Sequence, residues 1–364
     1  MQHVDLLIIG GGPSGLSAAK MAAESGVKSL VIERNSKIGG QLVKQTHMFF
    51  GSEKQYAKTR GINIAEILIQ DCMEHKDMIS FMTETTVVGL YPDYVVTVMD
   101  RNHQYSKIKA KTILIATGAS EKVLAFENND LPGIYGAGAV QTLMNVHGVL
   151  PGQDVVMVGS GNIGLIVSYQ LMQAGVNVKR VIEASSVIGG YKVHASKLKR
   201  LGVDIQTQTT IKRANGKEAV SSIIVQRLDD DWTFVPGTEE EISVDAVCVS
   251  VGLSPLSNLL SMMGCEMKYV SALGGHVPVI DQSHETSVDN IFVAGDVCGV
   301  EEASSAIVEG YYVGLIIGNK LGKPHPHYEH LIQDFSQQLD NLRSGPFGEK
   351  TRTGLKELRG DQHA

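Results

Sequence analysis

Three glycines near the start of the chain have the spacing of a phosphate-binding turn. Gly10, Gly12 and Gly15 lie in the stretch GGGPSG, and Glu33 ends the apolar segment that follows. Glycines at this spacing permit a tight turn, close approach of the backbone to a pyrophosphate, and close packing of a helix on a strand. The helix would direct unpaired N–H groups at the phosphates, and the Glu33 carboxylate could accept hydrogen bonds from ribose hydroxyls. This pattern predicts a dinucleotide site.

A second copy of the pattern lies in GSGNIG, with Gly159, Gly161 and Gly164, and Glu183 ends the next apolar segment. A carboxylate at this position repels a 2′-phosphate, and the residues that follow, ASSVIGG, include no Arg to bind one. The second site is therefore predicted to take NAD(H) rather than NADP(H). The alternative is a domain that has kept its shape and lost its nucleotide.

Each glycine turn must be positioned by a strand before it and by a helix and a strand after it. The patterns of residues 4–33 and 154–183 predict two such βαβ units. Similar segments follow both units, KIGGQ and VIGGY, then ILIATGAS and VCVSVGLS, which indicates an internal duplication. A further strand pattern, residues 287–296, comes after the second fold has ended, so the first domain is predicted to be discontinuous.

We therefore expect an α/β fold with two Rossmann-like dinucleotide-binding domains. The second domain, residues 120–252, is inserted into the first, residues 1–119 and 253–325. A helical C-terminal tail, residues 326–364, would pack either on its own domain or on a partner subunit. Its apolar residues at helical spacing are Ile332, Phe335, Leu339 and Leu342.

The composition excludes some classes of partner. The 364 residues carry a formal net charge of -7 without a basic cluster, which argues against a nucleic-acid surface. No apolar run approaches the roughly 20 residues that span a bilayer, and the start of the sequence has no basic leader. We expect a cytoplasmic protein without a membrane span.

The cysteines are too widely separated for a C-x-x-C pair or for the ligand set of zinc or an iron–sulfur cluster. No metal site is predicted. The four cysteines are Cys72, Cys248, Cys265 and Cys298.

Several motifs together resemble the two-dinucleotide-binding-domain flavoproteins of the pyridine nucleotide–disulfide oxidoreductase superfamily. The resemblance covers most of residues 1–320 and rests on DLLIIGGGPSGLSAA, GGQL, ILIATG, GSGNIG and NIFVAGD. It implies FAD in the first domain and a pyridine nucleotide in the second. It also implies that a helix starting near Glu302 directs its N-terminus at the isoalloxazine, where the helix dipole stabilises negative charge on the reduced flavin.

The resemblance and the two glycine turns together assign residues to each site. For FAD the assigned residues are Gly10, Gly12, Pro13, Ser14, Gly15, Glu33, Arg34, Gly40, Gln41, Val87, Thr117, Gly118, Asp296, Glu302 and Ala303. For NAD they are Gly159, Gly161, Asn162, Ile163, Gly164, Glu183 and Gly252.

The chain lacks the redox dithiol of this superfamily. The reductases place C-x-x-C either early in the first fold or just before the second glycine turn. At the latter position this chain has Gly136, Ala137, Gly138 and Ala139, and the former reads GGQLVKQTH without a thiol. A mechanism through an internal thiol pair is therefore excluded.

A narrower resemblance indicates where electrons go instead. LPGIYGAGAVQTLMNVHGVLPGQDVVMVGSGNIG and AGDVCGVEEASSAIVEG resemble the FAD- and NAD-binding α subunits of hetero-oligomeric amine dehydrogenases and oxidases. That group includes dye-linked L-proline dehydrogenase, opine oxidase, sarcosine oxidase and hydrogen cyanide synthase. The resemblance implies a partner, a second flavoprotein subunit that oxidises the amine, and is compatible with a small iron–sulfur partner.

Two other functions remain open at this point. One is a free-standing NADH-dependent flavin reductase or NADH oxidase, and the other is a scaffold subunit whose FAD is structural. Hydride transfer between stacked cofactors needs no side-chain acid or base, so the catalytic residues are left unassigned. The two weak candidates are His47 and Cys298, both more simply interpreted as structural residues.

Overall fold

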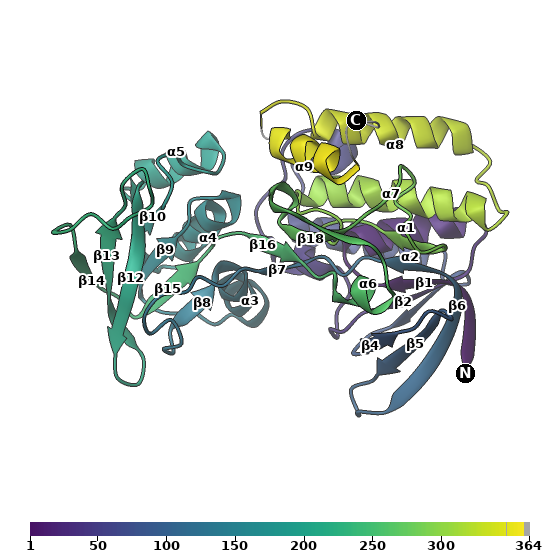
Figure 1. Cartoon of the computed structure of the whole chain (residues 1–364), viewed down its shortest axis with the longest axis horizontal. Helices are drawn as coiled ribbons and strands as arrows, with labels where there is room; N and C mark the ends of the chain where they lie inside the picture. The colour runs from purple at the N-terminus through teal and green to yellow at the C-terminus, as the bar shows by residue number, and fades with distance from the viewer. Residues whose placement is uncertain (347, 360–364) are drawn as a thin grey trace. The chain divides into compact units, whose positions relative to one another are not determined.

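The protein is described by a computed structural model of residues 1–346 and 348–359. The chain forms two compact units: in Figure 1 the purple and yellow ends of the chain belong to one unit, and the teal middle of the chain forms the other. Unit 1 comprises residues 1–120 and 254–364, and unit 2 comprises residues 121–253. The chain thus leaves unit 1, builds unit 2 and returns, and the predicted insertion of one Rossmann-like domain into another is confirmed. The last residues of the predicted tail, 360–364, and residue 347 lie outside the described part.

Unit 1 is built on a seven-stranded sheet with the order β3-β2-β1-β6-β5-β4, in which β19 also pairs with β6. Strands β3, β2, β1, β6 and β19 are parallel neighbours, whereas β4, β5 and the first half of β6 form an antiparallel meander. The bounds are β1 (Gln2–Ile9), β2 (Ser29–Ile32), β3 (Ile79–Met82), β4 (Thr86–Leu90), β5 (Val95–Met99), β6 (Tyr105–Ile115) and β19 (Ile291–Val293). The strand predicted within residues 287–296 is therefore present as β19.

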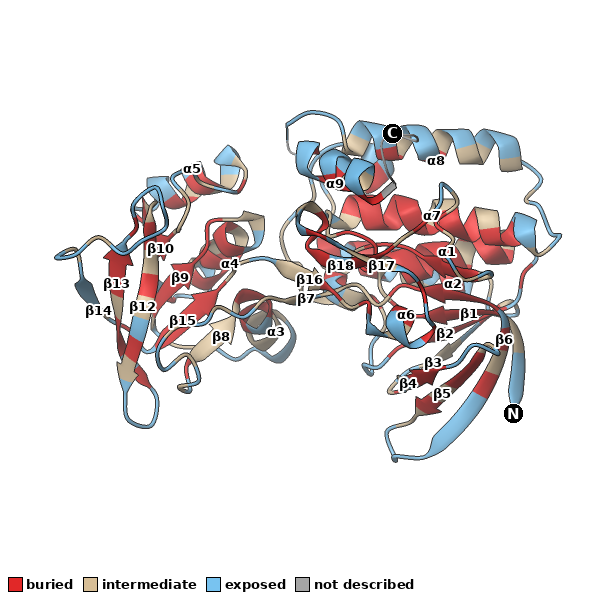
Figure 2. Cartoon of the chain, in the orientation of Figure 1, coloured by how far each residue is buried: buried red, intermediate tan, exposed pale blue. Residues whose placement is uncertain are grey.

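Helices cover this sheet, and α1 and α7 approach each other closely. A Cβ at Gly310 of α7 would lie 2.2 Å from the Ser14 carbonyl oxygen, so only glycine permits this contact. Figure 2 shows both helices largely buried. The helices of unit 1 are α1 (Pro13–Glu24), α2 (Gly61–Met73), α6 (Asn258–Met262), α7 (Ala303–Lys320), α8 (Tyr328–Leu342) and α9 (Glu349–Arg359), with short 3₁₀ turns η1 (Gly40–Lys44), η2 (Glu53–Gln55) and η3 (Ser271–Leu273). A hairpin is formed by β17 (Met267–Val270) and β18 (Gly275–Pro278).

Unit 2 repeats the parallel arrangement, with the strand order β11-β10-β9-β15-β8, and adds an antiparallel sheet, β12-β13-β14. Its elements are β8 (Ile134–Gly136), α3 (Ala137–His147), β9 (Asp154–Val158), α4 (Asn162–Gln173), β10 (Asn177–Ile182), α5 (Lys192–Arg200), β11 (Asp204–Gln206), β12 (Thr209–Gly216), β13 (Val220–Arg227), β14 (Glu240–Ser243) and β15 (Ala246–Val249). Two short strands lie where the chain passes between units, β7 (Ala119–Glu121) and β16 (Leu253–Pro255). Strand β8 lies beside β15 in the same way as β19 lies beside β6 in unit 1. In unit 2 this strand comes first along the chain, whereas in unit 1 it comes last.

The C-terminal tail packs on its own unit. Phe335 and Leu339 of α8 are buried against Met21, Val308 and Leu315 of α1 and α7. The sequence left open whether the apolar stripe of α8 packs on its own domain or on a partner subunit. In the structure it packs on its own unit, so this stripe is not a free docking surface for a partner.

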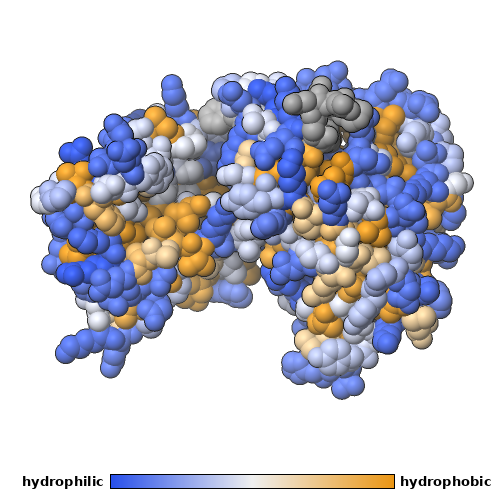
Figure 3. Space-filling view, viewed as in Figure 1, coloured by the Kyte–Doolittle hydropathy of each residue, from blue (hydrophilic) through white to orange (hydrophobic). Residues whose placement is uncertain are grey.

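The face of the molecule drawn in Figure 3 carries mainly hydrophilic residues with some apolar areas between them. Figure 2 shows the outer side of α8 exposed. Among the described residues, no helix combines the length and the apolar character that crossing a bilayer requires.

Candidate functional site

Two glycines of the first turn are required by the fold itself. Gly10 has φ +113°, and a Cβ there would lie 2.2 Å from the Ala116 carbonyl oxygen at the end of β6. A Cβ at Gly15 would lie 2.0 Å from the Gly10 carbonyl oxygen. Because both clashes are with backbone, they cannot be relieved by moving a side chain. Packing alone therefore explains these two glycines.

The middle glycine is different, because no close contact of the fold explains it. A Cβ at Gly12 would have Gly40 Cα, at 3.8 Å, as its nearest neighbour, and Gly12 has the ordinary extended φ of -82°. Any residue could adopt this backbone. Gly12 is the N-cap of α1, whose first residue is Pro13. A glycine at the open N-terminus of a helix leaves space for a phosphate to approach the backbone, so the local geometry fits a pyrophosphate.

Glu33 lies at the end of β2, beside this turn, and is buried. Its carboxylate accepts the Gly11 N–H at 3.0 Å, and the Asn35 N–H and side-chain amide at 2.8 Å each. These bonds hold the carboxylate next to the glycine turn. An oxygen with one such bond has a second lone pair, so Glu33 can still accept a hydrogen bond from a ribose hydroxyl.

Unit 2 reproduces this site in detail. A Cβ at Gly159 would lie 2.1 Å from the Ser250 carbonyl oxygen, and one at Gly164 would lie 2.3 Å from the Gly159 carbonyl oxygen. A Cβ at Gly161 meets nothing within 4 Å. Both units therefore need their outer glycines for packing and leave the middle one open.

Glu183 at the end of β10 takes the place that Glu33 has in unit 1. It accepts the Ser160 N–H at 2.8 Å, the Ser160 hydroxyl at 2.7 Å and the Ser185 N–H at 3.0 Å. The carboxylate is half-buried beside the open Gly161. Its position and charge suit a ribose that carries free hydroxyls rather than a phosphate.

Three other residues assigned to FAD follow the ends of parallel strands in unit 1. Thr117 and Gly118 follow β6, and the Thr117 hydroxyl donates to the Leu256 carbonyl at 2.8 Å. Asp296 follows β19. The carboxyl ends of parallel strands are where open α/β sheets bind ligands.

The remaining assigned residues belong to several further elements of the two units. Arg34 and Gln41 are exposed, and Gly40 begins η1. Glu302 and Ala303 are the N-cap and first residue of α7. Val87 belongs to β4, where it pairs with Val98, and β4 begins directly after Thr85, whose N–H donates to the Glu33 carbonyl oxygen at 3.0 Å. The remaining residues assigned to NAD surround the second turn: Asn162 and Ile163 begin α4, and Gly252, with φ +109°, follows β15.

The two weak catalytic candidates have structural surroundings. The His47 ring stacks on Phe49, with the ring centroids 5.8 Å apart. Cys298 is buried, and its thiol donates to the Gly295 carbonyl oxygen at 3.1 Å. Burial and the neighbouring Glu309 raise the pKa of this thiol well above its ordinary value, which disfavours the nucleophilic thiolate.

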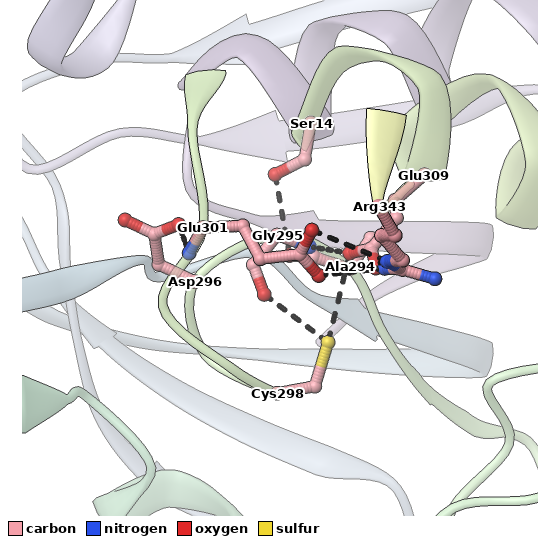
Figure 4. A network of polar contacts seen from close by, with 8 residues as sticks. All are labelled: Ser14, Ala294, Gly295, Asp296, Cys298, Glu301, Glu309 and Arg343. Carbon is pink, nitrogen blue, oxygen red and sulfur yellow. Dashed lines mark hydrogen bonds and ion pairs between the residues drawn. The ribbon is translucent and has the colours of Figure 1, made fainter. Parts of the chain in front are cut away.

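The Asp296 carboxyl group is a weaker acid than an ordinary aspartate side chain. Removal from water raises its pKa to about 7, and the Glu301 and Glu309 carboxylates act in the same direction, opposed by a hydrogen bond from the Glu301 N–H at 3.3 Å. Near neutral pH the side chain can therefore donate as well as accept a hydrogen bond. Figure 4 shows one of its oxygens directed away from this network.

A carboxylate occupies the helix start at which the reductases of this superfamily carry their dithiol. Glu121 accepts the Gly138 N–H at 2.6 Å and the Ala139 N–H at 3.3 Å, at the first turn of α3. A Cβ at Gly136 would lie 2.3 Å from a Glu121 oxygen. Glu121 was not predicted from the sequence, in which its signal is an acidic residue some distance before a glycine-rich helix start.

One group of described residues has the composition of a metal site, although none was predicted. The ligand atoms of His284, Cys298 and Glu309, all buried, lie within 4.8 Å of one another. One Glu309 oxygen accepts from Arg343, and the other accepts the Gly295 N–H at 2.8 Å and the Cys298 thiol at 3.7 Å. The guanidinium supplies the positive charge that a metal ion would otherwise bring, so we interpret the group as a hydrogen-bonded network.

Comparison with known proteins decides the family. A sequence model of the pyridine nucleotide-disulphide oxidoreductases matches residues 4–310, most of the chain. The chain belongs to this family. The predicted resemblance is confirmed, and the protein is an FAD-dependent oxidoreductase of a family that binds FAD and a pyridine nucleotide.

Its curated relatives include components of larger enzymes. The chain is 27% identical over 336 residues to the alpha subunit of sarcosine oxidase from Corynebacterium sp., a match covering 88% of this chain and 33% of that one. It is 27% identical to one of the subunits of opine oxidase from Agrobacterium tumefaciens, covering 85% of this chain and 64% of that one. The chain therefore spans about one third to two thirds of the length of these relatives.

Solved structures agree on the fold. L-proline dehydrogenase from P. horikoshii superimposes with a TM-score of 0.67 at 25% identity, covering 91% of this chain and 59% of that one. Thioredoxin reductase from T. acidophilum gives a TM-score of 0.71 at 19% identity, covering 88% of this chain and 99% of that one. The second likeness concerns the fold alone, since the dithiol position here holds glycine and alanine.

Proposed function

We propose that this chain is the electron-transfer subunit of a hetero-oligomeric amine dehydrogenase of the proline, sarcosine or opine type, and that it passes electrons between NAD(H), FAD and a redox centre of its partner. One observation carries the proposal: both glycine turns have the geometry of a dinucleotide cradle, while glycine and alanine stand at the position of the thiol pair. Electrons that enter such a chain have no internal disulfide to reduce. The names of the relatives, which include oxidase subunits, support a second polypeptide as the exit.

In unit 1 the backbone and the helix ends perform the binding. The N–H groups at the start of α1, next to Gly12, would hold the pyrophosphate of FAD, and Glu33 would accept from its ribose. The dipole of α7, which begins at Ala303, would favour negative charge on the reduced flavin. FAD and NADH supply the hydride chemistry when they are bound, and the protein supplies binding and orientation.

In unit 2 Gly161 would admit the pyrophosphate of the nicotinamide nucleotide, and Glu183 would bind its ribose. A ribose 2′-phosphate would meet the Glu183 carboxylate, which is already fixed by Ser160 and Ser185. The repulsion between two anions favours NAD(H).

The test is rapid mixing of the purified chain with NADH, followed at the visible bands of the flavin, and then with proline, sarcosine and an opine. We expect NADH to bleach the flavin of the isolated chain, and the amines to bleach it only when the native partner is present. The Gly161→Ala variant is the matched control, because it keeps FAD and blocks the second cradle. Rapid bleaching of the isolated chain by an amine would contradict the division of labour.

A second candidate is a free-standing NADH-dependent flavin reductase, and one observation favours it. The apolar stripe of α8, the docking surface suggested by the sequence, is covered by its own unit. Steady turnover of NADH with oxygen, a quinone or a dye, together with a native protein that contains only this chain, would select this function. Absence of any flavin reduction by NADH would instead select the scaffold role.

A further inference from the structure

The loop that carries Asp296 is held from below by a buried polar network. This loop connects β19 to α7, and Glu309 of α7 accepts the Gly295 N–H of the loop at 2.8 Å. The Ser14 hydroxyl of α1 donates to the Ala294 carbonyl at 3.2 Å. Figure 4 shows these contacts together with the Cys298 thiol beneath the same turn. The position of Asp296 therefore depends on Glu309.

This network contains two carboxylates and a cation from a distant part of the chain. The Arg343 guanidinium contacts Glu301 through Nη2 at 2.7 Å and through Nε at 3.1 and 3.2 Å, and it also donates through Nη2 to Glu309. The side chains of Arg343, Glu301 and Glu309 are only 11%, 11% and 6% exposed. Burial of this kind is tolerated when charges are paired, and removal of one partner leaves an uncompensated charge.

The C-terminal tail brings Arg343 to this position. Arg343 is the C-cap of α8, whose apolar face is packed on α7, and its own carbonyl oxygen accepts a hydrogen bond from Arg352 of α9. Both helices of the tail thus fix the residue. The two carboxylates raise the pKa of Arg343 against the opposing effect of burial, so the cation is permanent.

We propose that Arg343 is a positioning residue of the FAD site: by pairing with Glu301 and Glu309 it fixes the loop that carries Asp296 and the start of α7. The proposal rests on the proposed binding of FAD by unit 1. Arg343 reaches the site through the two carboxylates. Without it, Glu301 and Glu309 would repel each other and Asp296, and the loop would rearrange.

The experiment compares Arg343→Met with wild-type protein by two measurements. The first is the rate at which the aromatic disulfide dithiobis(nitrobenzoate) modifies thiols in the FAD-free protein. Cys298 lies under the loop, and the Cys298→Ser variant identifies its share of the reaction. The second is the dissociation constant of FAD. We expect the Cys298 thiol to react at least ~10-fold faster and FAD to bind at least ~10-fold more weakly in Arg343→Met.

Three controls separate positioning from general stability. Lys54→Met removes an exposed ion pair of α8, that of Lys54 with Asp334 at 2.6 Å, and should change neither measurement. Val96→Ala removes buried apolar groups from β5 of unit 1, away from α8, and should lower the free energy of unfolding while leaving FAD affinity unchanged. The combination of Arg343→Met with Glu301→Gln and Glu309→Gln removes all three charges and should restore FAD affinity to near the wild-type value.

Each outcome decides the proposal. Fast thiol modification with unchanged FAD affinity would overturn the link to the cofactor, and two unchanged measurements would overturn the positioning role altogether. If Arg343→Met does not fold, Arg343→Lys, which keeps the charge and loses the fork of contacts, should show intermediate values of both. A wild-type protein that binds no FAD would refute the proposed function, and the thiol measurement would still report on the loop.

Discussion

The middle glycine of the first turn provides a test that separates stability from binding. A Cβ at Gly12 makes no contact closer than 3.8 Å, and the backbone φ of -82° suits alanine. Gly12→Ala should therefore change the stability of the FAD-free protein by less than about 1 kcal/mol, because the lost freedom of the unfolded chain is offset by the poorer N-cap that alanine makes. The same methyl group would occupy the space into which the pyrophosphate must come.

The binding change follows from the contacts that would be lost. Displacing the phosphates from two backbone N–H groups, each worth roughly 1.5 kcal/mol or more to a charged acceptor, weakens FAD binding by about 3 kcal/mol, or about 100-fold. Urea denaturation of the FAD-free protein gives the stability, and quenching of flavin fluorescence gives the dissociation constant.

The matched variant is Gly15→Ala, whose Cβ would lie 2.0 Å from the Gly10 carbonyl oxygen. It should lower the free energy of unfolding by about 3 kcal/mol or more, because backbone must move to admit the methyl group. Gly12→Ala protein that retains wild-type FAD affinity would refute the assignment of the pyrophosphate to this turn. A large loss of stability in the FAD-free Gly12→Ala protein would refute the packing argument.

Three further predictions concern the second site and the acid in unit 1. Gly161→Ala, whose Cβ meets nothing within 4 Å, should retain FAD and stability but lose rapid reduction by NADH, and normal reduction would show that the nucleotide binds elsewhere. Glu183→Ala combined with Ser185→Arg should shift the preference towards NADPH; a wild type that is already reduced faster by NADPH would contradict the role of Glu183. Burial raises the pKa of Asp296 to about 7. The protonated side chain therefore favours the folded FAD-free protein at acidic pH, and this contribution to the free energy of unfolding is lost as the pH rises through about 7. The free energy of unfolding should fall between pH 4 and pH 8, and Asp296→Asn should remove up to about 4 kcal/mol of this fall in denaturation curves. An unchanged pH dependence would refute the raised pKa of Asp296.

Local patterns in the sequence predicted the parts of the fold that depend on neighbouring residues. The two glycine turns are visible because backbone clashes demand glycine at Gly10 and Gly15, and because apolar runs surround them. The strand within residues 287–296 was predictable from its apolar character and its place after the second fold. These features need no knowledge of distant contacts.

The parts that depend on distant contacts were not predictable. The stripe of α8 indicates one buried face, but a helical period does not say whether the covering surface belongs to the same chain. Arg343 is an ordinary basic residue in the sequence, and its role appears only when α8 places it beside Glu301 and Glu309. Glu121 likewise lies 17 residues before the N–H of Gly138 that it accepts.

The central claim, that electrons pass through FAD without an internal thiol pair, is tested most directly by an anaerobic titration of the FAD-loaded protein with NADH. The account predicts that the flavin bleaches fully, that a single pair of electrons is taken up for each FAD, and that no new thiols appear. The described part of the chain supports this count, because its four cysteines are all buried and none is paired. Uptake of a second pair of electrons, with newly reactive thiols, would contradict the account, and so would a flavin that NADH does not reduce.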